Sequence, residues 1–398
     1  GKKGKGKKGK GKKGKKGKKG KKGKKGKGKK LPGEKYCAGM STEQMLSVLV
    51  QERMVRTPRE EAAIRELVGE FNYLGTIFQS AETRDAFGWW VPPDPSYAQV
   101  RQSLTEYAVL PMGDEEVRAA LPKEVWVKSV MLYGPSGCGK TLLTEAVARH
   151  TGALFVTISP EALEGRYSGK GEPAKLLHMV FSVARAPEYQ PAVIYMDQVD
   201  QFFPPKKKSA ATHASKFKKD LVAYMKSLKP EERVIVIGNS SAPHTIQDNS
   251  DAKTLKEFKG MFDKYLYIPW PDYATRVRLW TTLLRRRLEQ PVPEEFDVSA
   301  MARLSAGYSA GSIEKAIDRV LTERRIQSLY KRPLRETEFI GPLSMCPRTF
   351  ESDNTKYRAF TAYVTDLKKR RDAEKKRKEE GEDGGDKKKG KGKGKKGK

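Results

Sequence analysis

The sequence lacks the features that several classes of protein require. Only three of the 398 residues are cysteine (Cys37, Cys138 and Cys346), which is too few and too scattered for a disulfide framework or a zinc site and fits a reducing compartment. No apolar run reaches the ~18 residues of a membrane span, so no membrane partner is expected. A secretory signal is also missing and the first residue is Gly, so we expect a longer chain whose N-terminal address lies upstream.

Charge is what the sequence has in excess, and most of it lies at the two ends. Residues 1–30 contain only Gly and Lys, 19 of them Lys, and residues 387–398 add eight more Lys. The body, residues 31–367, carries only +3 of the net charge of +31. The two Lys/Gly-rich ends cannot bury apolar surface and repel themselves, so the sequence predicts that they are disordered.

The basic ends predict contacts with polyanions, for example acidic tails of another protein. Nucleic acid is not the expected partner, because these segments lack the aromatic and Arg side chains on which bases stack. The alternative is a solvated extension that makes only weak contacts with acidic partners.

Residues 31–112 are predicted to form a helical N-terminal region. A capping box at Ser41 and Gln44 precedes one amphipathic segment, and a second box from Thr57 to Glu60 precedes another that extends to Phe71. Residues 89–93 (Trp-Trp-Val-Pro-Pro) interrupt this pattern, and a looser stretch follows up to Pro111.

From residue 113 to 270, apolar β-prone runs alternate with helical patterns, which predicts an α/β domain with a parallel sheet covered on both faces. The predicted strands are 127–133, 153–158, 192–196, 233–237 and 265–268, and the predicted helices are 141–150, 174–186 and 215–228. Residues 271–345 are predicted to be a helical lid, with its clearest helix at 312–330, and residues 346–398 a C-terminal extension with a basic tail.

A phosphate-binding loop follows the first predicted strand and matches G-x-x-x-x-G-K-[ST]. In such a loop the glycines let backbone amides surround the phosphates at the start of a helix, Lys140 reaches the β- and γ-phosphates, and Thr141 offers its hydroxyl to Mg²⁺. The predicted nucleotide-binding residues here are Gly134, Pro135, Ser136, Gly137, Cys138, Gly139, Lys140, Thr141 and Leu142. Cys138 is interpreted as a small loop residue, not a redox switch.

A second strand ends in a carboxylate, Asp197, which suits binding of Mg²⁺ through water. The next residue is Gln198, where an active ATPase of this type needs a Glu to accept a proton from the attacking water. An amide cannot accept that proton at neutral pH, so loss or slowing of hydrolysis is predicted. Asp200 is the nearest carboxylate, and we expect it to point elsewhere.

With these motifs in place, residues 120–330 resemble an AAA-type ATPase module. The segment 163–169 is similar to the pore loop of that family, with Tyr167 at the aromatic position that grips a translocated polypeptide, although a core or surface tyrosine is an equal alternative. Residues 307–312 resemble the start of the lid helix. The resemblance implies ATP or ADP with Mg²⁺ as ligands.

The sequence departs from the family at several positions. At the γ-phosphate sensor either Asn239 or Ser241 can serve, and the sequence leaves both open. Where the family has two arginine fingers, this chain has Met261 and Lys264, and neither offers the planar fork of Arg. Together with Gln198, these residues predict a module that binds nucleotide and hydrolyses it poorly.

The Lys/Gly segments around a divergent AAA module resemble the ciliary IQ- and AAA-domain-containing proteins of the nexin–dynein regulatory complex. This resemblance implies an axonemal structural subunit of the cilium or flagellum, with other subunits of that complex and tubulin of the doublet microtubules as partners. Calmodulin is a further expected partner, through an upstream region. Two alternatives remain: an active hexameric remodelling or microtubule-severing ATPase, and a polyanion-binding adaptor with an inert AAA module.

Overall fold

The computed structural model describes residues 31–70, 94–120, 122, 126–167, 169–203, 213–349, 351–367, 369–373 and 375–377. The predicted Lys/Gly-rich ends, the interruption at 89–93, Phe71 and Ser168 lie outside these residues. Within the described part of the chain, no helix combines the length and the apolar character that crossing a membrane requires.

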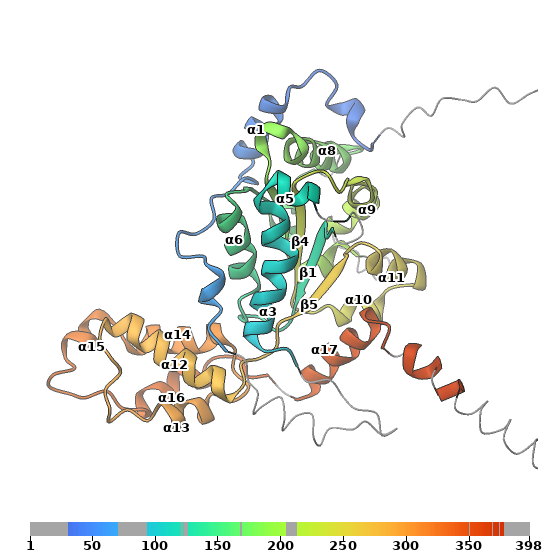
Figure 1. Cartoon of the computed structure of the whole chain (residues 1–398). Helices are drawn as coiled ribbons and strands as arrows, with labels where there is room; N and C mark the ends of the chain where they lie inside the picture. Colours follow the sequence, from blue (N-terminus) through green and yellow to red (C-terminus); the bar gives the residue numbers. More distant parts are fainter. Residues whose placement is uncertain are drawn as a thin grey trace, which may run out of the picture.

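A parallel sheet lies at the centre of the described chain, as predicted (Figure 1). Its strand order is β2-β3-β4-β1-β5, and the residues of β1 and β3 are buried throughout because helices cover both faces. The strands are β1 Ser129–Tyr133, β2 Leu154–Ile158, β3 Ala192–Met196, β4 Val234–Ser240 and β5 Lys264–Tyr267. Every pairing is parallel, so the carboxyl ends of the strands meet at one edge of the sheet.

Two apolar cores lie on opposite faces of this sheet. One core contains side chains of α6 and α3, and the other contains side chains of α1, α8, α9, α11 and α17. These helices are α1 Thr42–Gln51, α3 Tyr97–Leu104, α6 Lys140–Thr151, α8 Glu172–Arg185, α9 Lys218–Ser227, α11 Ala252–Lys259 and α17 Glu351–Val364. Shorter elements connect them: α7 Pro160–Leu163, η4 Pro187–Tyr189, η5 Val199–Phe202, η7 His213–Phe217 and α10 His244–Asn249.

The N-terminal region confirms one predicted helix and contradicts the next. After η1 (Glu34–Tyr36), α1 (Thr42–Gln51) begins with the predicted capping box at Ser41 and packs against α8. Between residues 57 and 70, where the described stretch ends, the chain is irregular apart from the 3₁₀ turn η2 (Ile64–Glu66). The prediction failed because Val55 pairs with Val156 at the edge of β2, and these distant backbone bonds override the local capping signal.

The stretch before Pro111, which was expected to be irregular, is helical. It comprises α3 (Tyr97–Leu104), a π-helical turn (Thr105–Val109) and α4 (Leu110–Gly113), and α5 (Glu115–Ala120) follows. A capping box between Ser96 and Gln99 starts this run and is a sequence signal that was missed. The π turn lies just before Pro111, which has no amide hydrogen to donate.

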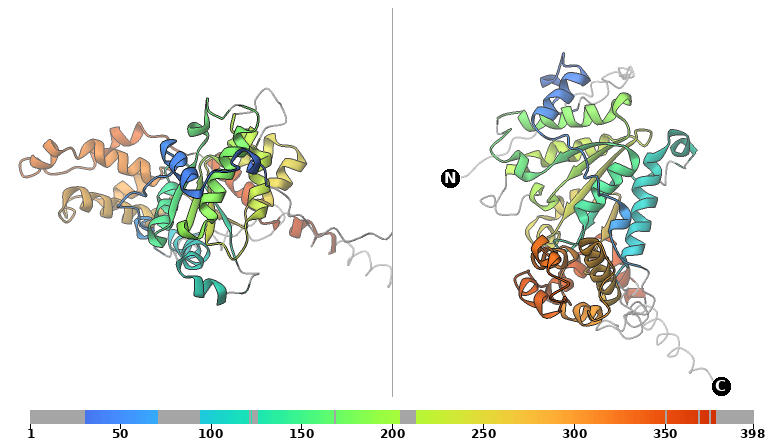
Figure 2. Two further views of the ribbon diagram at one scale, coloured as in Figure 1. Left: turned by 90° about the horizontal axis from the view of Figure 1, so that it is seen from above. Right: turned by 90° about the vertical axis from the view of Figure 1, so that its left-hand side faces the viewer.

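Five helices after β5 form a lid with its own core around Trp280 and Phe339, whose rings lie 5.3 Å apart. They are α12 Tyr273–Leu288, α13 Val298–Leu304, α14 Ala310–Val320, α15 Glu323–Gln327 and α16 Thr337–Ser344. The lid projects to one side of the sheet domain (Figures 1 and 2). The single helix predicted for 312–330 is wrong, because the chain turns at Leu321 and Thr322 caps a second helix.

Candidate nucleotide-binding site

The predicted phosphate loop connects β1 to α6 at the carboxyl edge of the sheet. Two of its glycines are required by close approach: a Cβ on Gly134 would lie 2.1 Å from the carbonyl oxygen of Ile268, and one on Gly137 would lie 2.5 Å from Ser309 Oγ. α6 begins after Gly139 without a side-chain cap. The first amides of this helix are therefore available to an anion.

Lys140 is held inside the loop, with 8% of its surface exposed. Its Nζ donates to the carbonyl oxygens of Gly134 at 2.8 Å and Pro135 at 2.6 Å. Burial lowers the pKa of Lys140 to about 8. A buried ammonium whose hydrogen bonds go to carbonyl oxygens is suited to a polyanionic ligand such as a nucleotide phosphate.

Thr141 and Asp197 line the same cavity, as a Mg²⁺ site of this type requires. Their hydroxyl and carboxylate oxygens are the hard ligands that Mg²⁺ prefers, and the phosphates of the nucleotide would complete the set. The described residues contain no group of three or more His, Cys, Asp or Glu side chains that could hold a metal ion alone. The donor set therefore fits Mg²⁺ bound together with nucleotide.

Tyr195 connects two of the predicted residues and was missed by the sequence analysis. Its hydroxyl lies 3.3 Å from Thr141 Oγ1 and accepts from Asn239 Nδ2 at 3.2 Å. Asn239 is buried behind this tyrosine, whereas Ser241, the alternative sensor, lines the cavity. Of the two sensor residues that the sequence left open, the structure brings Ser241 to the nucleotide cavity.

Gln198 follows Asp197 in a left-handed backbone conformation, with φ of 45°. Its Nε2 donates to Glu161 Oε1 at 3.3 Å, and its Oε1 accepts from Gln201. Both ends of the amide are thus engaged by neighbouring side chains. Gln198 lines the cavity but presents no carboxylate to a bound water.

The expectation that Asp200 points away is wrong. The left-handed Gln198 and the turn η5 fold the chain back, so that Asp200 lines the cavity beside Asp197. It accepts a hydrogen bond of 2.6 Å from Ser240 Oγ. Burial raises the pKa of the Asp200 carboxyl above its usual range.

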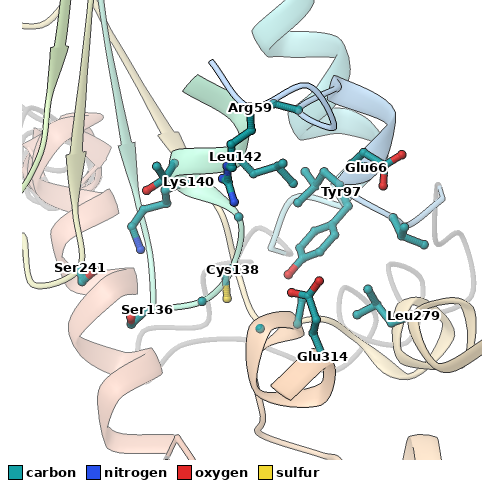
Figure 3. Close-up of a pocket in the computed structure, with 18 of the residues that line it drawn as sticks. Arg59, Glu66, Tyr97, Ser136, Cys138, Lys140, Leu142, Ser241, Leu279 and Glu314 are labelled. Carbon is teal, nitrogen blue, oxygen red and sulfur yellow. The ribbon is translucent and has the colours of Figure 1, made fainter. Parts of the chain in front are cut away.

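The cavity has a volume of about 670 Å³ and lies between the loop, the lid and residues 59–68 of the N-terminal region (Figure 3). Lys140 and Ser241 lie at one end, and Glu66 and Leu279 lie at the other. The amide of Gly311 in the lid donates to the carbonyl oxygen of Gly137 at 2.9 Å. The lid therefore touches the phosphate loop directly.

Ion pairs fasten residues 59–70, which we call the strap, to both sides of the cavity. Arg59 binds Glu145 of α6 at 2.5 Å, and Glu70 binds Arg278 of α12 at 2.8 Å. Glu66 forms a further ion pair with Arg286 of α12. The strap thus joins the sheet domain to the lid across the cavity.

We expect Arg286→Met to speed nucleotide release about threefold, because it removes the strap–lid pair while keeping the aliphatic stem. The pair is partly exposed, and such pairs contribute at most about 1 kcal/mol.

Stopped-flow displacement of a fluorescent ADP analogue measures the rate of nucleotide release. Arg285→Met is the matched control, since Arg285 is exposed one residue away. In a double-mutant cycle, Glu66→Gln should add little to Arg286→Met, and equal release rates in the Arg285 and Arg286 variants would contradict the role of the strap.

Of the other predicted residues, Ser136, Cys138 and Leu142 line this cavity, whereas Tyr167, Met261 and Lys264 do not. Tyr167 is half-buried against the sheet-domain core, and its neighbour Arg166 binds Glu52 at 2.9 Å. Met261 is buried, and Lys264 Nζ lies 4.7 Å from the centre of the Tyr107 ring. Cys138 is fully buried in the loop, and burial raises the pKa of its thiol to about 11. A thiol with this pKa carries almost no thiolate at neutral pH.

The fold and this cavity define a P-loop nucleotide-binding domain with a helical lid. The sequence model of the family described as "ATPase family associated with various cellular activities (AAA)" matches residues 130–258. These residues form an AAA domain, and the predicted fold class is confirmed.

The chain is 31% identical over 314 residues to dynein regulatory complex protein 11 of Mus musculus, which covers 77% of this chain and 34% of that protein. It is 32% identical over 215 residues to spastin of Ixodes scapularis, which covers 54% of this chain and 31% of that protein. The chain thus spans about a third of the length of these relatives. The predicted resemblance to an AAA protein of the dynein regulatory complex is confirmed.

Two solved structures share the fold. The crystal structure of the FIGL-1 AAA domain in complex with ADP has a TM-score of 0.56 and 21% identity, covering 81% of this chain and 97% of that chain. A structure described as "Structural Basis for Katanin Self-Assembly" has a TM-score of 0.51 and 19% identity, covering 78% of this chain and 94% of that chain. At these identities the similarity concerns the fold.

Proposed function

We propose that this chain is an ATP-binding, hydrolysis-poor AAA module of a structural subunit of the dynein regulatory complex, on doublet microtubules of the cilium or flagellum. The observation that carries the proposal is a complete phosphate loop around Lys140 next to an amide, Gln198, where hydrolysis needs a base. Bound nucleotide would then stabilise the closed arrangement of lid and sheet domain instead of driving a cycle.

Two features support poor hydrolysis. The Gln198 amide is engaged by Glu161 and Gln201, so it is not free to orient an attacking water. Met261, at the position where the family has an arginine finger, is buried and carries no charge. In this proposal, Gln198 and Met261 replace the carboxylate and the arginine that phosphoryl transfer uses at these two positions of the family.

The axonemal part of the proposal is supported by the similarity to dynein regulatory complex protein 11. The Lys/Gly-rich ends of the sequence suit acidic partners such as the glutamate-rich tails of tubulin. Co-purification of the tagged full-length protein with dynein regulatory complex subunits from isolated axonemes tests this part. A protein that is fully extracted with the soluble fraction of the cilium would contradict it.

The nucleotide part is tested by identifying the nucleotide that the purified chain retains and by measuring its Mg²⁺-dependent turnover. We expect bound ATP or ADP and a turnover below ~0.01 per second, far under the ordinary enzyme range of about 1–10³ per second. Turnover of ~1 per second would overturn the assignment of poor hydrolysis. A chain without nucleotide affinity would overturn the binding itself.

The second candidate is an active remodelling ATPase, and the observation in its favour is Asp200. Its carboxylate lines the cavity, where it could accept a proton in place of a Glu at position 198. This candidate predicts substantial turnover that Asp200→Asn abolishes. Tyr167 gives it less support, because that side chain is half-buried.

A further inference from the structure

The C-terminal helix α17 (Glu351–Val364) returns to the sheet domain and contacts the candidate nucleotide site (Figure 1). The hydroxyl of Tyr357 donates a hydrogen bond to the carbonyl oxygen of Ser241. Ser241 therefore both lines the nucleotide cavity and is hydrogen-bonded to α17.

A second contact of α17 is with the end of β1, directly before the phosphate loop. The ring of Phe360 lies 5.1 Å from the ring of Tyr133, and Thr361 Oγ1 lies 2.8 Å from the Tyr133 hydroxyl. Tyr133 is the last residue of β1 and directly precedes Gly134. α17 thus contacts the end of β1, directly before the phosphate loop, and the turn after β4.

The side chains around Tyr357 are incompletely hydrogen-bonded. The rings of His244 and Trp270 lie 5.9 Å and 5.6 Å from the Tyr357 ring, both edge-on. In the described residues, His244 Nδ1 and Trp270 Nε1 are buried without a hydrogen-bond partner. Buried unpaired groups are costly, so the position of α17 is sensitive to small movements of the turn that carries Ser241 and His244.

The outer contacts of α17 are surface ion pairs, which hold the helix weakly. Arg358 binds Asp94 at 3.1 Å, and Lys259 binds Asp366, just beyond the helix, at 2.6 Å. Exposed pairs of this kind contribute little. The edge-on aromatic contacts and the Tyr357 hydrogen bond therefore hold α17 more firmly than these ion pairs do.

We propose that nucleotide binding stabilises the position of α17. A phosphate that contacts Ser241 reduces the mobility of the turn after β4, and the hydrogen bond from the Tyr357 hydroxyl transmits this reduced mobility to the helix. The proposal rests on the proposed nucleotide site. The chain that continues from α17 carries the C-terminal Lys-rich segment, so nucleotide occupancy would control the anchoring of a basic extension. Such coupling requires that nucleotide bind more tightly when α17 is firmly packed than when it is loosely packed.

Hydrogen exchange measured by mass spectrometry on the full chain, with and without Mg²⁺-ATP, tests this coupling. We expect ATP to slow exchange of the α17 amides about fivefold, the scale of one net hydrogen bond. The amides of α1 are the internal reference, because α1 packs on α8 and not on the phosphate site. Tyr357→Phe removes only the hydroxyl and should abolish the α17 response. Tyr363→Phe, on the same helix, is the control that should keep it.

The outcomes are separable because ATP affinity is measured in parallel by calorimetry. ATP that binds normally while α17 and α1 slow equally would indicate general stabilisation and overturn the proposal. A response that persists in Tyr357→Phe would overturn the route through the hydroxyl. Absence of ATP binding to the wild type would overturn the proposed nucleotide site, and this inference with it.

Discussion

Replacing Lys140 with methionine is expected to lower nucleotide affinity about a hundredfold and to stabilise the unliganded fold. Affinity falls because the charged hydrogen bonds of a phosphate-binding lysine contribute about 1.5–3 kcal/mol. The fold gains stability because the pKa of Lys140 is lowered by burial from 10.5 to about 8, a cost of about 3 kcal/mol. Loss of the bonds to the carbonyl oxygens of Gly134 and Pro135 offsets part of this, leaving a gain of about 2 kcal/mol.

The pH dependence identifies the origin of this gain. A lysine whose pKa is lowered in the folded state costs stability in full below the folded pKa, and the cost disappears as the pH rises from about 8 to 10.5. Urea unfolding of the unliganded wild type should therefore show stability rising between pH 7 and 9.5, relative to Lys140→Met. The affinity for ADP is measured by calorimetry at pH 7. Parallel pH profiles for the two proteins would contradict the buried charge as the cause.

Exchanging the acid and the amide of the Glu161–Gln198 pair is expected to raise ATP turnover about a hundredfold over the wild type. The double variant Glu161→Gln, Gln198→Glu places a carboxylate next to Asp197 and keeps an amide as its hydrogen-bond donor. A general base contributes about 10²–10⁴-fold. We expect the lower limit, because Met261 supplies no positive charge to the transferred phosphoryl group.

The single variant Gln198→Glu is the matched comparison and should gain less than tenfold. It would set two carboxylates side by side where Gln198 Nε2 and Glu161 Oε1 now lie 3.3 Å apart, and such pairs raise one pKa so that a proton stays bound. Steady-state phosphate release measures the variants and Glu161→Gln alone. If the double variant is no faster than the wild type, a missing base is not what limits hydrolysis.

The sequence predicted the elements whose signals are local. The phosphate loop was recognisable because its glycines, Lys140 and Thr141 are consecutive and follow a buried strand. The parallel sheet followed from alternating apolar runs, and the start of α1 from the capping box at Ser41. Each of these signals depends on neighbouring residues and agrees with the tertiary structure around it.

Other expectations failed where distant contacts decide the conformation. The helix predicted after Thr57 is replaced by the strap, because Val55 pairs with Val156 of β2, and Arg59, Glu66 and Glu70 then find partners on α6 and α12. Asp200 lies on the cavity wall because Gln198 adopts a left-handed conformation, for which spacing along a strand gives no signal.

The sequence by itself determined the class of protein: the absence of cysteine clusters and apolar spans, the neutral body between basic ends, and a phosphate loop paired with Gln198. Only the tertiary structure decided which side chains meet around the cavity. It placed Ser241 on the cavity wall and buried Asn239, brought the strap to the cavity and placed Tyr357 of α17 against Ser241. The physical reason is that backbone signals act over a few residues, whereas the walls of a site are set by packing between segments far apart in the chain.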